Sequence, residues 1–212
     1  MRKLFVILLA LTVLACKKAP NRPVKDQKDS VSHTKVEPKD SIPIPVNKEE
    51  VLRKTNDELL QALKNKDYKK FAEFIHPEKG VRFSMYAFVD PGGDKHFSKA
   101  DFEKYSSAKT IFTWGALDGS GDSYKVTIND YLQKWVFSKD FTVSQFSLNE
   151  FQKTGNSLNN VKEIYPKNDF TENYIKGTEK YGEMDWKTLR FVFEKFQGKY
   201  YLVAVVNDQW TV

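Results

Sequence analysis

The last 24 residues of the chain, 189–212, constrain its fold most strongly. Two runs rich in Phe, Tyr and Val flank Gln197-Gly198. Glycine readily takes the positive φ angle that a tight turn needs, so the sequence predicts a hairpin of two long antiparallel strands. Large apolar side chains alternate with more mixed ones along the first run, which predicts one apolar face and one mixed face. A lone hairpin is marginally stable in water, so earlier segments must supply further strands and a covering helix.

The segment that begins at Asn47 supplies such a helix. Asn47 and Glu50 form a capping-box pattern, and apolar side chains then recur at helical spacing as far as about Lys64. Asp67 is placed to cap a second short helix, which His76-Pro77 ends. Residues 85–89 and 168–176 are strand-like, and residues 128–136 place their apolar side chains on one helical face. We therefore expect an α+β domain, with the N-terminal helices packed on the concave face of a curved antiparallel sheet.

The amino terminus is typical of an export signal. Met1-Arg2-Lys3 precedes an apolar run over residues 4–15, which is too short to span a bilayer as a mature helix. Residues 13–16, Val-Leu-Ala-Cys, resemble the lipobox of bacterial lipoproteins. This predicts removal of a signal peptide over residues 1–15 and attachment of acyl chains such as palmitate to Cys16. The alternative is an ordinary signal peptide with an incidental cysteine.

Lipid on Cys16 implies membrane lipid as a partner, and an exported protein anchored to the cell membrane or outer membrane of a bacterium. Residues 16–46 hold five of the eight prolines and few aromatic residues, so they are predicted to be a disordered tether. The formal charge of +6 is modest and forms no basic stripe with aromatic residues, so nucleic acid is not an expected partner. With one cysteine, the chain cannot form an internal disulfide.

Several motifs resemble known families. Leu63-Lys-Asn-Lys-Asp67, the exit at His76-Pro77 and the closing hairpin resemble the NTF2-like superfamily, whose α+β domain is cone-shaped. Residues 76–84, 112–115, 118–121, 158–160 and 208–211 are more closely similar to a family of uncharacterised bacterial exported proteins and lipoproteins. The resemblance covers residues 47–212, and it implies one domain with a pocket between helices and sheet. It brings no assigned activity.

The most chemically capable group lies just after the second helix. His76, Glu78 and Arg82 place an imidazole, a carboxylate and a guanidinium in one short stretch. This group is a candidate for ligand binding or catalysis. In the alternative interpretation Glu78 pairs with Arg82 to fix the loop, and His76 caps the carboxyl end of the preceding helix.

A second set of candidates comes from the aromatic residues and the closing strands. Trp114, Arg190, Asp208 and Trp210 are candidates to line the pocket, although burial in the core explains each one separately. No metal site is expected: residues 118–129 lack the Gly and Glu that a calcium loop needs at its sixth and twelfth positions. The chain also lacks a phosphate-binding glycine loop, a serine nucleophile elbow and a Cys-His arrangement, so no cofactor is expected.

These observations leave three hypotheses for function. The leading one is a membrane-anchored envelope lipoprotein that binds a small molecule, peptide or protein partner in a cone-shaped pocket and is not an enzyme. The second is an envelope hydrolase or isomerase with His76 as general base, oriented by Glu78 or Asp208, and with Arg82 stabilising negative charge. The third is a structural or accessory subunit of an envelope complex, marked by an exposed apolar patch.

Overall fold

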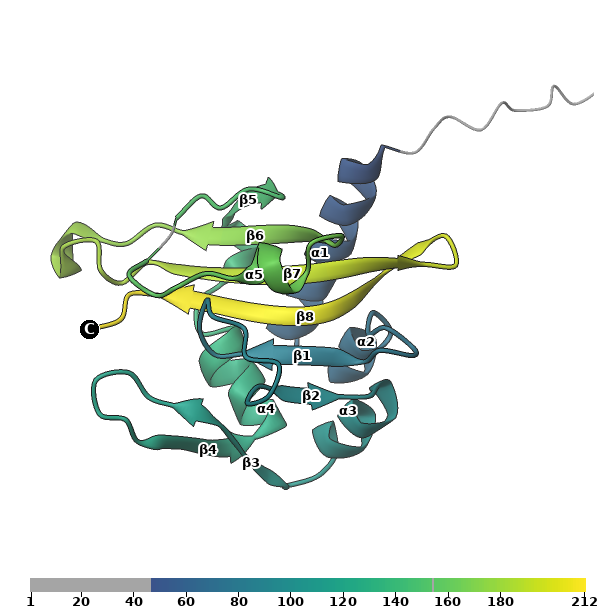
Figure 1. Cartoon of the computed structure of the whole chain (residues 1–212), viewed down its shortest axis with the longest axis horizontal. Coiled ribbons are helices and arrows are strands. Elements are labelled where there is room, and N and C mark those ends of the chain that lie inside the picture. The colour runs from purple at the N-terminus through teal and green to yellow at the C-terminus, as the bar shows by residue number, and fades with distance from the viewer. Residues whose placement is uncertain (1–46, 154) are drawn as a thin grey trace, which may run out of the picture. The chain divides into compact units, whose positions relative to one another are not determined.

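The terminal hairpin lies at the centre of a six-stranded sheet. Its strands are β7 (Lys187–Phe196) and β8 (Lys199–Gln209), and the turn residues Gln197 and Gly198 have φ angles of 49° and 82°. The strand order is β2-β1-β8-β7-β6-β5, and β3 and β4 form a separate two-stranded sheet (Figure 1). This computed structural model describes residues 47–153 and 155–212, so the predicted signal peptide, Cys16 and the predicted tether over residues 16–46 lie outside the described residues.

The sheet is mixed because one pair of strands is parallel. The remaining strands are β1 (Val81–Ser84), β2 (Lys95–Phe97), β3 (Ile111–Ala116), β4 (Ser123–Thr127), β5 (Gln145–Leu148) and β6 (Asp169–Ile175). β1 runs parallel to β8, and all other pairs are antiparallel. The purely antiparallel sheet expected from the sequence is therefore wrong in this one pair. The chain enters β1 beside the start of β8, where the His76 amide donates to the Leu202 carbonyl.

Helices precede and connect these strands. They are α1 (Lys48–Lys64), α2 (Tyr68–Ala72), α3 (Lys99–Ser106), α4 (Ile128–Tyr131) and α5 (Val161–Ile164), with a π-helical turn η1 (Leu132–Val136) and two 3-10 turns, η2 (Phe141–Val143) and η3 (Glu179–Tyr181). The Asn47 side chain accepts from the Glu49 amide, and Asp67 accepts from the Lys70 amide. Both predicted helix starts are confirmed, and each cap satisfies a backbone amide that the helix leaves free.

The main core lies between helices α1 to α4 and one face of the sheet. Leu59 of α1, Phe71 of α2 and Phe102 of α3 are fully buried there, together with Phe191 and Phe193 of β7. The α+β class with N-terminal helices covering a curved sheet is confirmed by this arrangement. Each fully buried Leu or Phe side chain contributes on the order of 1.5–3 kcal/mol of hydrophobic stabilisation.

The opposite face of the sheet is also buried, although the sequence predicts it to be mixed in polarity. Val192, Ala204 and Val206 form a second apolar cluster with Val89 and Val161. The segments that cover this face are α5 and the irregular stretches at residues 85–90, 149–153 and 155–160. Both faces of β7 and β8 are thus removed from water, which explains the nearly continuous apolar sequence of β8.

Residues 85–89 do not form the strand that their apolar side chains predict. β1 ends at Ser84, whose hydroxyl oxygen lies 2.9 and 2.8 Å from the carbonyl oxygens of Tyr86 and Phe88 and shares its single proton between them. These two side-chain contacts bend the backbone, because they compete with the bonds that would continue a strand. The bend allows Val89 to reach the second cluster.

A buried asparagine pair joins α1 to the sheet. Asn56 donates to Asn173 Oδ1 at 3.0 Å, and Asn56 Oδ1 accepts from Asn173 Nδ2 and from the Thr171 hydroxyl, each at 2.8 Å. These bonds fix the helix on β6, since the groups have no access to water. No helix in the described part of the chain is long and apolar enough to cross a membrane.

Candidate functional site

His76 is fully buried where α2 leads into β1, and it organises the turn there. Its Nδ1 accepts from the backbone amides of Glu78 and Lys79, at 3.2 and 3.0 Å. Because Nδ1 is an acceptor, the neutral ring carries its proton on Nε2. That nitrogen has no hydrogen-bond partner among the described residues, and the nearest carboxylate oxygen is Glu194 Oε1 at 3.9 Å. The ring packs against Phe196. His76 therefore shapes the following turn and does not cap the preceding helix.

Glu78 and Arg82 do not pair with each other or with His76. Glu78 is exposed, and no ion pair involving it occurs within residues 47–153 and 155–212. Arg82 Nη1 donates to the Pro91 carbonyl at 3.0 Å and thereby holds the turn after residue 89. The carboxylate beside His76 is Glu194, which pairs with Lys79 at 2.7 Å. No local sequence pattern indicates this contact, because the two residues are far apart in the chain.

A small polar cavity of about 290 Å³ adjoins this group. Its lining residues are Lys79, Arg82, His96, Ile164, Tyr165, Asn168, Glu194 and Val203. The charged members are already engaged: Lys79 pairs with Glu194, and His96 Nε2 lies 2.6 Å from the Lys79 carbonyl. Asp208, the second carboxylate proposed to orient His76, lies near the other end of β8. The residues expected to form a catalytic group are therefore divided between two ends of the sheet.

Trp114 belongs to the core and does not line a pocket. It is 3% exposed, stacks on Tyr131 with ring centroids 3.7 Å apart, and donates from Nε1 to the Val126 carbonyl. Phe83 packs edge-on against both rings. Aromatic side chains thus fill the space between helices and sheet where the sequence predicts a hollow. The burial of Trp114 fits the alternative that it belongs to the core, and its part in ligand binding stays a prediction.

Arg190 and Asp208, two other candidates, do lie together, in a buried ionic cluster. Arg190 Nε donates to Glu172 Oε2 at 2.6 Å, and its Nη2 donates to Asp208 Oδ2 at 3.0 Å. All three side chains are at most 1% exposed. Glu172 stands directly opposite Arg190 on β6, and Asp208 is a diagonal neighbour on β8. Strand register therefore brings one guanidinium between two carboxylates.

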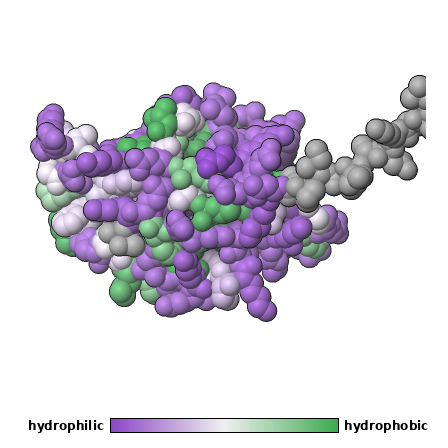
Figure 2. Space-filling view, turned by 90° about the horizontal axis from the view of Figure 1, so that it is seen from above, coloured by the Kyte–Doolittle hydropathy of each residue, from purple (hydrophilic) through white to green (hydrophobic). Residues whose placement is uncertain are grey.

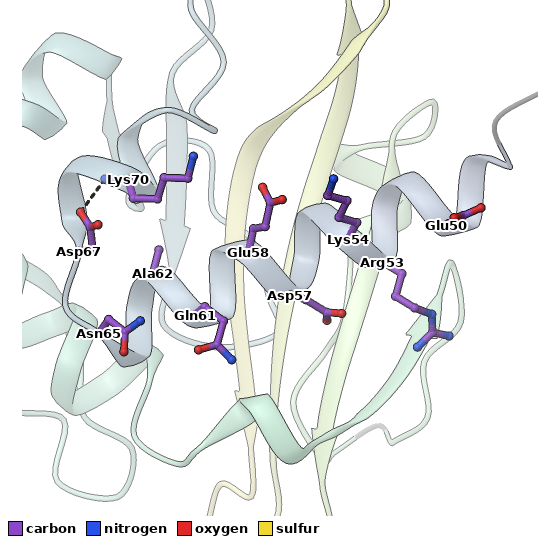
Figure 3. A pocket seen from close by; sticks show the side chains of 10 residues that line it. All are labelled: Glu50, Arg53, Lys54, Asp57, Glu58, Gln61, Ala62, Asn65, Asp67 and Lys70. Carbon is purple, nitrogen blue, oxygen red and sulfur yellow. Dashed lines mark hydrogen bonds between the residues drawn. The ribbon is translucent and has the colours of Figure 1, made fainter. Parts of the chain in front are cut away.

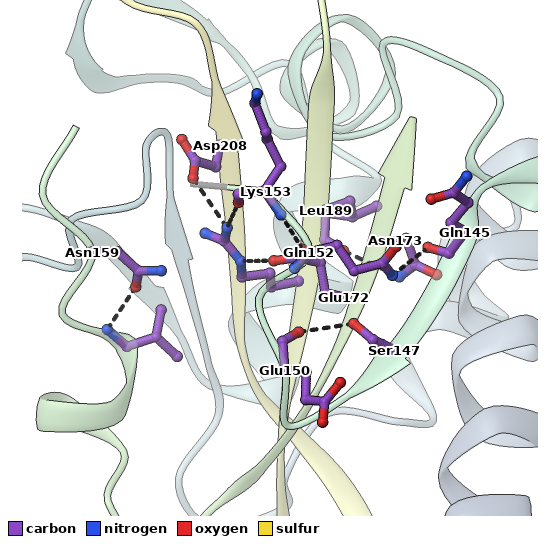
Figure 4. A network of polar contacts seen from close by, with 12 residues as sticks. Gln145, Ser147, Glu150, Gln152, Lys153, Asn159, Glu172, Asn173, Leu189 and Asp208 are labelled. Carbon is purple, nitrogen blue, oxygen red and sulfur yellow. Dashed lines mark hydrogen bonds and ion pairs between the residues drawn. The ribbon is translucent and has the colours of Figure 1, made fainter. Parts of the chain in front are cut away.

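This Glu172–Arg190–Asp208 cluster also holds the backbone that covers it. Glu172 Oε1 accepts from the amide of Gln152 at 2.6 Å, and Arg190 Nη2 donates to the Lys153 carbonyl at 3.3 Å (Figure 4). Burial raises the pKa of Asp208, and the nearby Arg190 guanidinium opposes that rise. Asp208 Oδ1 and Arg190 Nη1 have no partner among the described residues. Glu172 was missed by sequence analysis, where its only signal is a lone carboxylate inside a predicted strand.

Exposed apolar side chains gather at the end of the sheet where β8 finishes. We call this group the end surface: Phe88, Leu158, Tyr181, Met184, Trp210 and Val212. These are six of the eight large apolar residues that are exposed in the described chain. In Figure 1 the C-terminus and the neighbouring loops lie at this end, away from the β7–β8 turn and the start of α1.

Hydrogen bonds connect the loops that carry the end surface. Asn156 Oδ1 accepts from the Thr211 hydroxyl at 2.8 Å, which joins the loop after residue 155 to the C-terminal residues. Asn160 exchanges two bonds with the backbone of Val89, at 2.7 and 2.9 Å. The apolar side chains are therefore held by an ordered framework.

A cavity of about 410 Å³ opens within the end surface. Its lining residues are Lys153, Gly155, Asn156, Gly182, Glu183, Met184, Trp186 and Trp210. Trp186 is buried and forms one wall, whereas Trp210 is 44% exposed. Gly155 approaches the Trp186 indole so closely that a Cβ atom would lie 2.9 Å from the ring. Glycine is thus required there for the loop to reach this wall. Trp210 and Glu78 are the predicted ligand-binding residues that the structure leaves exposed.

A larger groove of about 510 Å³ runs along the outer side of α1. Its lining residues are Glu50, Arg53, Lys54, Asp57, Glu58, Gln61, Ala62, Asn65, Asp67 and Lys70. Figure 3 shows the charged side chains of both signs spread along the helix instead of converging on one point. The face in Figure 2 is likewise mostly hydrophilic, with small separate hydrophobic patches. The groove is therefore the solvated side of an amphipathic helix. In the described ranges no group of three His, Cys, Asp or Glu side chains is placed to hold a metal ion.

Comparison with known proteins finds similarity in structure alone. No family model and no curated protein matches the sequence. An NTF2-like protein from Cytophaga hutchinsonii aligns with 12% identity and a TM-score of 0.38, over 77% of this chain and 98% of its own. An NTF-2 like protein of unknown function from Shewanella oneidensis aligns with 7% identity and a TM-score of 0.35, over 76% and 98%. A DUF4783 family protein from Bacteroides ovatus aligns with 10% identity and a TM-score of 0.30, over 72% and 92%.

Two of these three proteins are described as NTF2-like, which is the superfamily that the sequence motifs resemble. Because all three TM-scores are below 0.5, the α+β fold rests on the sheet order and helix packing described above. Function has to be argued from the residues of this chain.

Proposed function

We propose that this chain is an exported bacterial lipoprotein, anchored through acyl chains on Cys16, whose folded domain binds a partner at the end surface. The observation that carries the binding function is that six of the eight large apolar residues exposed in the described chain lie in loops at one end of the sheet, where two of them, Met184 and Trp210, line a cavity. Exposed apolar side chains scattered singly need no explanation, whereas a group of them marks an interaction site.

The composition of the end surface supports this function. Trp210 offers a rigid, amphipathic contact area, and Met184 beside it adapts to partners of different shape. Both residue types are enriched where proteins bind one another. The cavity between them would accept one large side chain of a partner, which is the usual arrangement of an energetically dominant contact.

The position of the end surface fits an anchored protein. The described domain begins at Asn47, next to the start of α1, at the opposite end of the sheet from Trp210 (Figure 1). An anchor that lies before Asn47 in the sequence is therefore attached away from the end surface. A partner could reach that surface without displacing the attachment point.

The hydrolase or isomerase hypothesis has less support. A general base needs a free nitrogen within reach of substrate, but Nδ1 of His76 accepts two backbone amides and the ring is fully buried. Asp208 is bound to Arg190 at the other end of β8. The accessory-subunit hypothesis differs from our proposal only in what the partner is used for.

Photo-crosslinking in the producing bacterium tests the binding function. A photoreactive phenylalanine at position 210 should give a discrete cross-linked product, because it would lie against the partner. The matched control is position 143, where Val143 is 80% exposed but lies outside the end surface. If both positions give the same products, or neither gives any, the end surface is not a binding site.

Lipid labelling tests the anchor separately. The protein should incorporate an alkyne-tagged palmitate and sediment with membranes, whereas the Cys16→Ser variant should lose the label and become soluble. A Cys16→Ser protein that keeps the label or stays in the membrane fraction would contradict lipidation at this residue.

A further inference from the structure

The charges around the end surface indicate what kind of partner it takes. We infer that the end surface binds a cationic polypeptide segment that carries large apolar side chains. This inference rests on the proposed binding function and adds the chemistry of the partner to it.

The loops that build the end surface are acidic in an otherwise basic domain. These loops comprise residues 86–94, 117–122, 153, 155–160, 176–186 and 209–212, and they contain seven acidic and three basic side chains. The rest of residues 47–212 contains 17 acidic and 22 basic side chains. Such a separation of charge draws a positively charged partner towards this end of the molecule.

Of the acidic side chains in these loops, two form ion pairs within the protein and three are exposed and available to a partner. Glu183 is paired with Lys176 at 3.0 Å, and Asp185 with Lys139 at 3.2 Å. Asp90, Asp122 and Glu179 are exposed and form no ion pair with any described residue. Because they lie in three different loops around the apolar side chains, they would contact cationic groups on either side of an inserted apolar side chain.

The buried ionic cluster adds negative charge behind Trp210. Its two carboxylates, Glu172 and Asp208, share the single guanidinium of Arg190, and Asp208 Oδ1 has no partner among the described residues. Asp208 precedes Trp210 by two residues on the same chain segment. The face of an indole ring itself attracts cations. The acidic loops, the buried cluster with its extra carboxylate and the exposed indole therefore all favour a positively charged partner.

Other occupants fit these observations less well. Anionic lipid head groups attract basic surfaces and would be repelled by an acidic one. A free small molecule would fill the 410 Å³ cavity but would leave Phe88, Leu158 and Val212 exposed. A polypeptide segment covers both the cavity and the apolar side chains around it, as peptide ligands of grooves do.

Peptides that differ only in charge test the inference. The protein is the chain without residues 1–15 and with Cys16→Ser, which keeps every described element. The probes are three fluorescent peptides with identical Leu, Phe and Trp content and net charges of about +4, 0 and −4. We expect the cationic peptide to bind at least about tenfold more tightly than the acidic one. That difference should shrink as the salt concentration rises from about 50 to 500 mM.

Variants separate the apolar and charged contributions. Trp210→Ala should weaken binding of the cationic peptide about tenfold, whereas Val143→Ala, the exposed control, should leave it unchanged. Asp122→Asn combined with Glu179→Gln should lower the preference for the cationic peptide and spare the neutral one. Glu103→Gln, an exposed carboxylate on α3 and outside these loops, is the matched control. Circular dichroism melting confirms that each variant is folded.

Each outcome has a definite meaning. Equal binding of the three peptides, with loss in Trp210→Ala, overturns the inferred charge of the partner but leaves the binding function intact. If the protein binds phosphatidylglycerol vesicles and Trp210→Ala loses this binding, the partner is a membrane and the inference of a polypeptide partner is wrong. Absence of peptide binding together with a cross-link at position 210 overturns the inference alone, whereas absence of both removes the proposed function as well.

Discussion

At the scale of single residues, buried polar side chains fix the backbone of this protein at its turns. His76 accepts the two amides of the turn into β1, and Arg190 reaches the carbonyl of Lys153. Arg82 holds the following turn through the Pro91 carbonyl. These side chains look chemically capable in the sequence, but each one hydrogen-bonds to backbone groups and thereby fixes the course of a turn or loop.

Asp94 gives a pH-dependent prediction at this scale. Burial raises the pKa of Asp94 to about 6, against the lowering effects of the Asp90 amide, the Ser84 hydroxyl and Arg82. The folded protein therefore holds this proton more tightly than the unfolded chain does. Its contribution to stability is complete below the ordinary pKa of 3.8 and is lost as the pH rises through about 6.

The Asp94→Asn variant removes this pH dependence, because its amide stays neutral. Its free energy of unfolding should rise relative to the natural protein between about pH 4 and pH 6.5 and then stay level. Urea unfolding at a series of pH values measures the difference. Gln61→Ala, an exposed substitution that removes no titrating group, should show no such trend. If the difference in free energy of unfolding between Asp94→Asn and the natural protein does not change with pH, the Asp94 carboxylate titrates alike in the folded and unfolded states.

Arg190 gives a second prediction. Arg190→Met leaves Glu172 and Asp208 buried without their cation, and it should lower the free energy of unfolding by about 3–5 kcal/mol. Neutralising the carboxylates as well, with Glu172→Gln and Asp208→Asn, should recover part of that loss. Urea unfolding at pH 7 compares the single and triple variants. A triple variant no more stable than Arg190→Met would show that the loss comes from packing instead of unpaired charge.

At the scale of elements, polar contacts decide how the helix and the loops lie on the sheet. Apolar packing against Leu189 and Phe191 would allow α1 to slide, whereas the Asn56–Asn173 pair has one correct register. In the same way, the amides of residues 152 and 153 place their loop over the second face of the sheet through Glu172. Directional bonds thus complement non-directional apolar burial.

Removal of the helix contact should be costly. Asn56→Ala leaves Asn173 and Thr171 with buried polar atoms that have lost a partner, so it should lower the free energy of unfolding by about 2–3 kcal/mol. The matched control is Gln61→Ala on the exposed side of α1, which should change stability by less than about 0.5 kcal/mol. Chemical unfolding followed by tryptophan fluorescence measures both. Equal effects of the two substitutions would show that the pair adds nothing to helix docking.

At the scale of the whole molecule, the sequence predicts the elements better than the site. Periodicity identifies the hairpin and α1, because these signals lie within a single segment. Alternation along β7 tells which side chains share a face, but not that a distant loop covers Arg190. The end surface draws on loops from residue 86 to residue 212, so no local pattern reveals it. Trp114 closes the interior only because β3 and α4 bring it against Tyr131.

The filled interior is itself testable through Trp114. Trp114→Ala removes an indole that is 3% exposed and stacked on Tyr131, so it should lower the free energy of unfolding by about 3–5 kcal/mol. The space left would be apolar and dry, and such cavities take up small aromatic molecules. Added indole should therefore raise the melting temperature of this variant. The control Trp210→Ala removes a 44% exposed indole and should cost less than about 1 kcal/mol, with no response to indole in the core. If the natural protein were stabilised by indole as strongly as Trp114→Ala, its interior would contain the hollow that the sequence predicts, and Trp114 would line it.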